Sequence, residues 1–179
     1  MIQNSNITKI AEIFFNEPIK AHYLIEISKK SKLAHTSGKN YLISLKKEDI
    51  IKETIEKKGK RSFPVYTARI DNLKYKQYKK LYNLNKILNS GLIEVLRDQF
   101  MPKTIILFGS YAKGEDIETS DIDLFIEGKK KDISLQTFEN RLKRKIELHF
   151  NENFNDYPKE LKNNILNGYI LYGYLEVFK

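Results

Sequence analysis

Two neighbouring stretches indicate the fold of the C-terminal half: Phe108-Gly109-Ser110-Tyr111-Ala112-Lys113-Gly114 and, shortly after it, Ser120-Asp121-Ile122-Asp123-Leu124-Phe125-Ile126. Thr104–Phe108 and Ile122–Ile126 are short apolar runs typical of buried strands. A glycine directly after a buried strand lets the backbone approach a phosphate, and the N–H groups that follow can point at its oxygens. Gly109 and Ser110 are therefore candidate phosphate-binding residues.

Two aspartates stand at the start of the second apolar run. Side chains alternate along a strand, so the sequence predicts Asp121 and Asp123 on one face and Ile122, Leu124 and Ile126 on the other, in the core. Two neighbouring carboxylates repel each other unless a cation lies between them. Magnesium suits this place because it takes hard oxygen ligands and accepts phosphates in its shell. The alternative is that both are solvated acids on an edge strand.

A third acid, Glu147, lies in a run whose apolar residues are again every second one, Lys145–Phe150. We expect Glu147 to leave the core face and to join Asp121 and Asp123. Three acids and a phosphate-binding turn are what a phosphoryl or nucleotidyl transfer with two magnesium ions needs. Lys113 is expected either to reach a phosphate or to be a solvated loop lysine. His149 shares the face of Glu147, and a non-ligand role is favoured over contact with base or metal.

The spacing of these residues resembles a known family. Gly109-Ser110, ten residues, and then Asp121-Ile122-Asp123 resemble the signature of the DNA polymerase β-like nucleotidyltransferase superfamily, with the closest likeness to its minimal nucleotidyltransferases. By that resemblance Gly109 and Ser110 hold the nucleotide phosphates, and Asp121 and Asp123 bind the metals. Glu147 matches the third acidic position, where family members often carry aspartate.

Residues 1–70 have a different pattern. Apolar spacing predicts helices near 7–14, from His22 to Lys30, and over 36–47, followed by two short strands around a basic tip, Lys57–Arg61. This order resembles a winged helix-turn-helix domain. The segment carries 14 Lys/Arg against 7 Asp/Glu, whereas residues 101–179 carry 12 against 13. The basicity favours a module that binds duplex DNA, although lysine-rich composition alone would also produce it.

Residues 71–100 are predicted to be a helical connector that Gly91 divides. The expected fold class is therefore α+β, with three parts. These are a winged-helix domain (1–70), the connector (71–100), and a nucleotidyltransferase domain (101–179) made of a small mixed β-sheet with flanking helices.

The composition excludes several classes of protein. The chain has no cysteine, which excludes disulfides, thiolate zinc sites and cysteine nucleophiles, and only three histidines. No apolar run approaches the roughly 20 residues of a membrane span, and the first 15 residues do not resemble a signal peptide. We therefore expect a cytoplasmic protein without a membrane partner.

Two functional hypotheses follow. In the first, the protein is an enzyme that moves AMP from ATP, or another nucleoside monophosphate from its triphosphate, onto a macromolecular acceptor. Minimal nucleotidyltransferases often act as antitoxins that modify a HEPN-type toxin, so such a protein is an expected partner by resemblance alone. In the second, the protein is a DNA-binding regulator whose transferase-like half only binds or senses nucleotide. Winged-helix proteins are often dimers, so a homodimer is also expected.

Overall fold

The computed structural model describes residues 5–151, 154 and 157–177, which form two compact units. The first unit ends at Lys79 and the second begins at Lys80, within one helix. The sequence-based division at 70 and 100 stays a prediction. Among the described residues, no helix is both long and apolar enough to cross a membrane.

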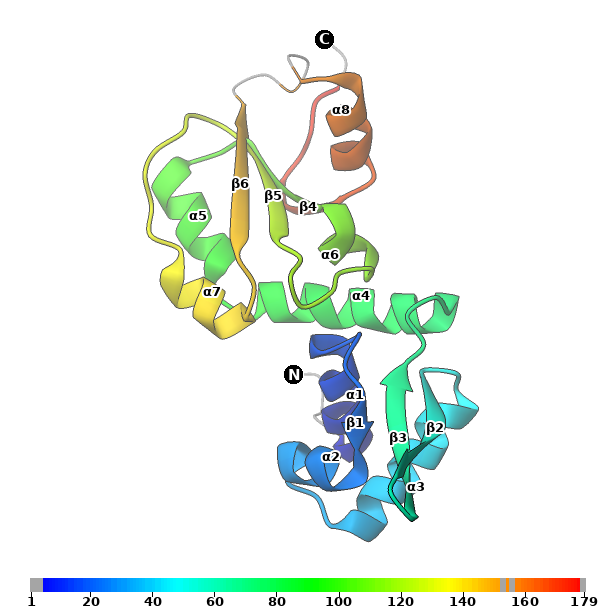
Figure 1. The fold of residues 1–179 in the computed structure, drawn as a ribbon. Helices are drawn as coiled ribbons and strands as arrows, with labels where there is room; N and C mark the ends of the chain where they lie inside the picture. The colour runs from blue at the N-terminus through cyan, green and yellow to red at the C-terminus, as the bar shows by residue number, and fades with distance from the viewer. Residues whose placement is uncertain (1–4, 152–153, 155–156, 178–179) are drawn as a thin grey trace. The chain divides into compact units, whose positions relative to one another are not determined.

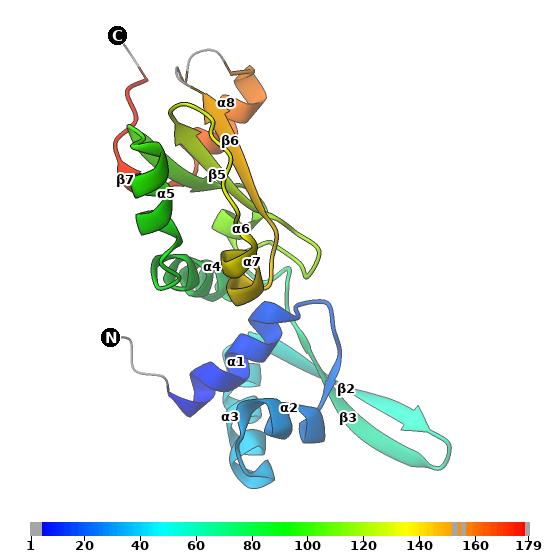
Figure 2. The ribbon, with the colours of Figure 1, turned by 90° about the vertical axis from the view of Figure 1, so that its left-hand side faces the viewer.

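The first unit consists of helices followed by a β-hairpin (Figures 1 and 2). Its elements are α1 (Asn6–Asn16), β1 (His22–Tyr23), α2 (Leu24–Ser31), α3 (His35–Lys47), β2 (Ile51–Lys58), β3 (Arg61–Ala68) and the first part of α4 (Leu73–Leu88). The three strands pair antiparallel in the order β1-β3-β2. Figure 2 shows the β2–β3 hairpin extending away from the helices.

The predicted helix from His22 was wrong at its start. His22 and Tyr23 pair with Tyr66 and Val65 of β3, so they form a short strand, and α2 begins only at Leu24. The core of the unit is apolar and joins α1, α2 and α3 through Ile10, Phe14, Ile27, Leu42 and Leu45. The winged-helix interpretation of this region stays a prediction.

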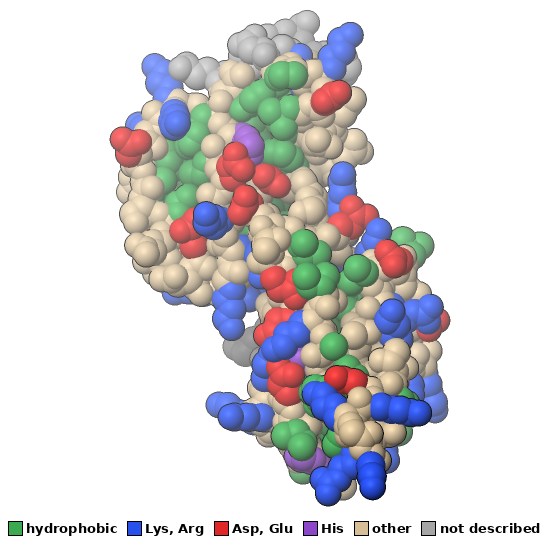
Figure 3. Space-filling view, in the orientation of Figure 1, with side chains coloured by type: hydrophobic (Ala, Val, Ile, Leu, Met, Phe, Trp, Pro, Cys, Tyr) green, Lys and Arg blue, Asp and Glu red, His purple; other side chains and the backbone are tan. Residues whose placement is uncertain are grey.

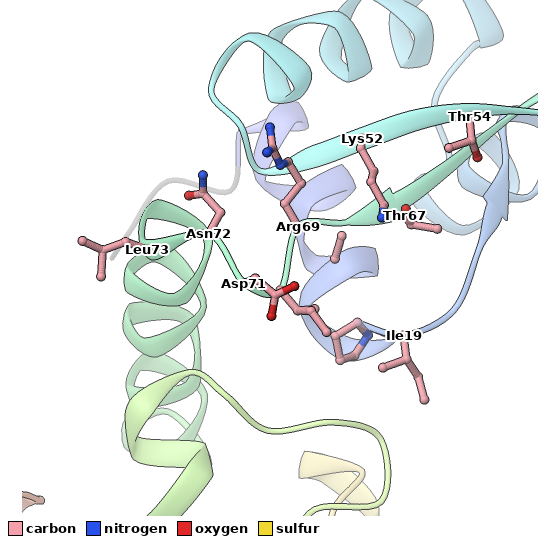
Figure 4. Close-up of a pocket in the computed structure, with 11 residues that line it drawn as sticks. Ile19, Lys52, Thr54, Thr67, Arg69, Asp71, Asn72 and Leu73 are labelled. Atoms are coloured by element: carbon pink, nitrogen blue, oxygen red, sulfur yellow. The ribbon is translucent and has the colours of Figure 1, made fainter.

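A cavity of about 860 Å³ lies in the first unit (Figure 4). Lys52, Thr54 and Thr67 line it from the sheet, and Asp71 and Asn72 line it from the segment that leads into α4. None of the predicted site residues is among its lining residues.

The second unit is built on a four-stranded mixed sheet. After the end of α4 it contains α5 (Leu92–Phe100), β4 (Thr104–Phe108), α6 (Gly109–Lys113), β5 (Ile122–Glu127), α7 (Gln136–Leu142), β6 (Ile146–Asn151), α8 (Lys159–Leu166) and β7 (Tyr169–Gly173). The strand order is β6-β5-β4-β7, with β5 and β6 parallel and the other neighbours antiparallel. Gly91, at φ 79°, separates α4 from α5, which confirms the predicted break.

Alternation along the strands divides the sheet into two packed faces. One face packs against α5 and α7 and contains Ile105, Leu107, Ile122, Leu124 and Ile126. The predicted core face of β5 is therefore confirmed. The opposite face contributes Ile106, Phe108 and Phe125 to a smaller cluster with Ile165 of α8. Asp123 lies two residues before Phe125 and so belongs to this second face.

Candidate functional site

The turn after β4 brings backbone directly against a carboxylate. Gly109 follows the buried Phe108 and has φ 75°, a conformation that residues with a Cβ rarely adopt. A Cβ placed on Gly109 would lie 2.2 Å from Oδ2 of Asp123. A larger residue here would therefore strain the backbone and displace the carboxylate, and the backbone of the turn lies beside that carboxylate.

The pairing of three strands positions two of the predicted acids. Asp123 lies opposite Phe108 in the antiparallel β4–β5 pair and opposite Glu147 in the parallel β5–β6 pair. The side chains of Asp123 and Glu147 are 26% and 59% exposed, so both can meet a ligand from solvent. Figure 3 shows acidic side chains gathered beside a histidine on the surface of this unit.

His149 completes the cluster. Its Nε2 lies 3.4 Å from Oδ1 of Asp123 and 3.9 Å from Oε1 of Glu147, and its ring packs edge-on against Phe108. The hydrogen bond to Asp123 raises the pKa of His149, and the charge of Glu147 acts in the same direction. The shared face of His149 and Glu147 was predicted from their spacing of two residues on one strand, and the favoured non-ligand role of His149 stays a prediction.

The remaining predicted residues lie around this cluster. Asp121 is half-buried but precedes β5, and it is not part of the group formed by Asp123, Glu147 and His149, whose ligand atoms lie within 4.8 Å of one another. Ser110 is half-buried at the start of α6, and Lys113 at the end of that helix is exposed. The structure thus brings Gly109, Asp123 and Glu147 together.

The donor set of the cluster suits a divalent cation. Asp123 and Glu147 supply carboxylate oxygens, the ligands that Mg²⁺ prefers, and Mg²⁺ usually keeps waters and substrate phosphates in its remaining positions. Within the described part of the chain, neither carboxylate has a lysine or arginine partner. Among the described residues, therefore, no ammonium or guanidinium group neutralises these two carboxylates, as a divalent cation would.

The part of the chain that carries this cluster is similar to a known protein family. Residues 90–175 match the profile of the family described as "Polymerase beta, Nucleotidyltransferase". The matched segment is just under half of the chain, and it contains Gly109, Ser110, Asp121, Asp123 and Glu147.

Two proteins of Methanocaldococcus jannaschii are similar to shorter parts of the chain. "Putative protein adenylyltransferase MJ1379" is 53% identical over 34 residues, which are 19% of this chain and 34% of that protein. "Putative protein adenylyltransferase MJ1215" is 45% identical over 49 residues, which are 27% of this chain and 56% of that protein. The chain thus covers about a third of one relative and just over half of the other. No solved structure gives a significant match.

These findings support nucleotidyl transfer as the general activity of the second unit. A site for a nucleoside triphosphate and its metals would account for a glycine turn, two paired strands and exposed carboxylates at one place. A phosphate chain needs close approach to backbone N–H groups, and its charge needs cations held by acids.

Proposed function

We propose that the protein transfers AMP from ATP onto a hydroxyl group of another protein, with Mg²⁺ as the cofactor. The observation that carries this proposal is the position of the Gly109 turn against Asp123, opposite Glu147, in a domain that matches the nucleotidyltransferase family. The names of both relatives, putative protein adenylyltransferases, support an adenylyl group as the group transferred and a protein as the acceptor. In the reaction the acceptor oxygen bonds to the α-phosphorus, the bond to the bridging oxygen breaks, pyrophosphate leaves, and the hydroxyl proton passes to solvent.

Each predicted residue has a role in this proposal. Asp121, Asp123 and Glu147 would hold two Mg²⁺ ions. When bound, these ions neutralise the triphosphate and favour ionisation of the attacking hydroxyl. Gly109 and Ser110 orient the phosphates through the backbone of their turn, and the exposed Lys113 contacts them from the end of α6. Glu147, the most exposed acid of the cluster, faces the side from which an acceptor protein can approach.

Mass spectrometry of a co-expressed protein tests the transfer. The acceptor to try first is a protein encoded next to this chain, and a HEPN-type toxin is the partner we propose. Wild type should add one AMP to it, and Asp123→Ala should add none while keeping its fold, because Asp123 faces solvent. Lack of modification of that protein and of every lysate protein by the wild type would remove the enzymatic proposal.

A thermal-shift measurement tests the cofactor separately. ATP with Mg²⁺ should raise the melting temperature, because a ligand that binds only the folded state stabilises it by mass action. The double variant Asp121→Asn, Asp123→Asn should lose the part of the shift that depends on metal. A shift that persists unchanged in the double variant would contradict the metal assignment.

We further propose that residues 1–70 form a winged-helix domain that binds duplex DNA. Lys and Arg side chains gather at the lower end of Figure 3, where Figure 1 places α3 and the β2–β3 hairpin. Within the described residues, the exposed Lys57, Lys60 and Arg61 of the hairpin tip have no carboxylate partner within 4.0 Å. These cations are available for phosphates, together with Lys39 and Lys47 of α3, which are also exposed.

The salt dependence of DNA binding tests this surface. Each phosphate contact adds about −0.9 to the slope of log K against log salt concentration. Neutralising Lys57, Lys60 and Arg61 to glutamine should therefore reduce the slope by about two to three units. Lys20 and Lys30, which are paired with Glu17 and Glu26, provide the control, because their replacement should change the slope little. DNA binding that ignores salt would exclude this surface.

A second function keeps the same DNA surface and assigns the other unit to nucleotide sensing. In that case the protein is a regulator, for which a homodimer is the natural form on a two-fold operator. Tight, nucleotide-dependent DNA binding without AMP transfer would favour this function.

A further inference from the structure

A buried ion pair is formed by residues that precede the paired strands β5 and β6 in the sequence. Asp116, in the segment between α6 and β5, has a side chain that is only 1% exposed. Its Oδ2 lies 3.5 Å from Nη2 of Arg144, whose side chain is 7% exposed. A buried carboxylate is costly unless it is paired and hydrogen-bonded, so this position requires a reason.

The side-chain amide of Asn83 connects the ion pair to the glycine turn. Asn83 is 2% exposed on α4, and its Nδ2 donates to Oδ1 of Asp116 at 2.7 Å. The same Nδ2 donates to the backbone carbonyl of Tyr111 at 2.9 Å. Tyr111 directly follows Ser110 in α6, and α6 begins at the candidate phosphate turn. One amide group therefore contacts both the carboxylate of Asp116 and this short helix.

Backbone hydrogen bonds also join the segment of Asp116 to the turn, and the start of β5 to the residue after Arg144. The N–H of Glu115 donates to the carbonyl of Ser110 at 3.0 Å. The N–H of Ile122, between the two aspartates, donates to the carbonyl of Lys145 at 2.8 Å. Lys145 directly follows Arg144, and Glu147 is two residues further along the chain. The network therefore touches all three segments that form the site.

We propose that Asp116, held by Asn83 and Arg144, is a positioning residue that aligns the Gly109–Ser110 turn with the strands of Asp123 and Glu147 and thereby sets the affinity of the site for divalent cations. Buried ion pairs are weak sources of stability, since apolar pairs of similar volume often stabilise a protein equally well. A role in fixing geometry explains why charge is kept here. The inference rests on the proposed metal-dependent nucleotide site.

Three variants of the full-length protein separate positioning from stability. Asp116→Asn keeps the shape of the side chain but removes the negative charge that faces Arg144. The double variant Asp116→Leu, Arg144→Met removes both charges at similar volume, so its melting temperature should return towards that of wild type. Asp98→Asn is the control, because Asp98 pairs with Arg97 on the exposed surface of α5, where side chains are 66% and 47% exposed.

Two measurements are made on each variant. The first is the Mg²⁺ concentration for half-maximal binding of an ATP analogue with a non-cleavable α,β bridge. We expect an increase of about tenfold or more for Asp116→Asn and for the double variant, as for residues that orient metal ligands, and none for Asp98→Asn. The second is hydrogen exchange of the metal-free protein, which should become faster over 117–123 and 144–148 in the two Asp116 variants only.

The outcomes distinguish this inference from the proposed function. A double variant that regains both the melting temperature and the wild-type Mg²⁺ requirement would overturn the positioning role. A wild-type protein that binds the analogue with Mg²⁺ but transfers no AMP would overturn the proposed activity and leave the positioning role standing. A wild-type protein without any Mg²⁺-dependent binding of the analogue would overturn both.

Discussion

Each unit of the protein holds one histidine grouped with two acids, with their ligand atoms within 4.8 Å of one another: Glu17, His22 and Glu26 in the first unit, and Asp123, Glu147 and His149 in the second. The same three side-chain types therefore occur in two surroundings. The two clusters differ in their charged neighbours, and for this reason the second of the two is the candidate metal site.

In the first cluster, lysine ammonium groups lie where a metal cation would have to bind. Nζ of Lys30 lies 2.6 Å from Glu17 and 3.1 Å from Glu26, and Nζ of Lys20 lies 2.7 Å from Glu26. Burial raises the pKa of Glu26, but hydrogen bonds from both lysines outweigh it and lower that pKa to about 2. His22 is fully buried, and this burial lowers its pKa. Two ammonium groups thus neutralise two carboxylates around a histidine whose burial disfavours protonation.

In the second cluster the charges are left for a ligand. Among the described residues Asp123 and Glu147 have no lysine or arginine partner, and the pKa of His149 is raised, opposite in direction to that of His22. A donor set alone therefore does not make a metal site. Where lysine side chains already neutralise the carboxylates, a metal ion gains little by binding. Where they do not, the carboxylates remain available as metal ligands.

The largest difference in the rate of AMP transfer is expected between two variants that each remove one carboxylate, one from each cluster. Asp123→Asn should lower the rate of AMP transfer by about a thousandfold, since metal-held charge stabilisation is worth several kcal/mol. Glu17→Gln removes a carboxylate of the same kind from the lysine-filled cluster and should leave the rate unchanged. Equal losses for the two variants in single-turnover assays would contradict the difference between the two clusters.

A smaller effect should follow from adding a methyl group at either of two glycines with similar backbone. Gly109 and Gly91 have φ of 75° and 79°, but only at Gly109 would a Cβ meet Asp123. Both alanine variants should lose about 1–3 kcal/mol of stability through backbone strain. Gly109→Ala should in addition lower transfer by about a hundredfold, because it displaces the carboxylate. Equal activities at matched stability, measured by urea unfolding and AMP transfer, would contradict this role.

The smallest effect concerns the pH dependence of stability. Because burial lowers the pKa of folded His22 below that of the unfolded chain, the unfolded state binds the proton first as pH falls below about 6.5. The contribution of His22 to stability should therefore decrease from pH 7.5 to 5, while His149, whose pKa is raised, contributes in the opposite direction, and His22→Leu should remove the decrease. The contribution of Glu26 is lost only below about pH 4.5, outside this range. His35→Gln, at an exposed histidine, is the control, and urea unfolding at each pH is the measurement. An unchanged decline in His22→Leu would exclude His22 as its source.

Local sequence patterns predicted the elements of the second unit well. Thr104–Phe108 forms a strand with the predicted bounds, and Ile122, Leu124 and Ile126 face the core as expected, because alternation and burial are local properties of a chain. The strand β7 was not predicted, since Tyr169–Gly173 becomes a strand only by pairing with β4, more than 60 residues away. The short strand at His22 was missed for the same reason.

The predicted site shows the same limit. Asp123 and Glu147 meet as expected because both lie within strands, where parity is reliable. The alternation was extended to Asp121, but β5 begins at Ile122, so parity does not place that side chain in the cluster. Asp116 and Asn83 could not be recognised, because nothing in the sequence indicates that a loop acid and a helix amide 33 residues apart will be buried together.

The parallel pairing of β5 with β6 has a consequence for the order of folding. A parallel pair cannot close through a tight hairpin, so Asp123 meets Glu147 only after the intervening segment with α7 has crossed back along the sheet. Contacts of this kind form slowly because loop closure costs entropy before any pairing repays it. On the ribosome the turn at Gly109 and its aspartate emerge before the strand that supplies the second acid. The cluster of Asp123 and Glu147 therefore forms only after β6 has been made, and a chain stopped before β6 carries the Gly109 and Asp123 motif without its second acid.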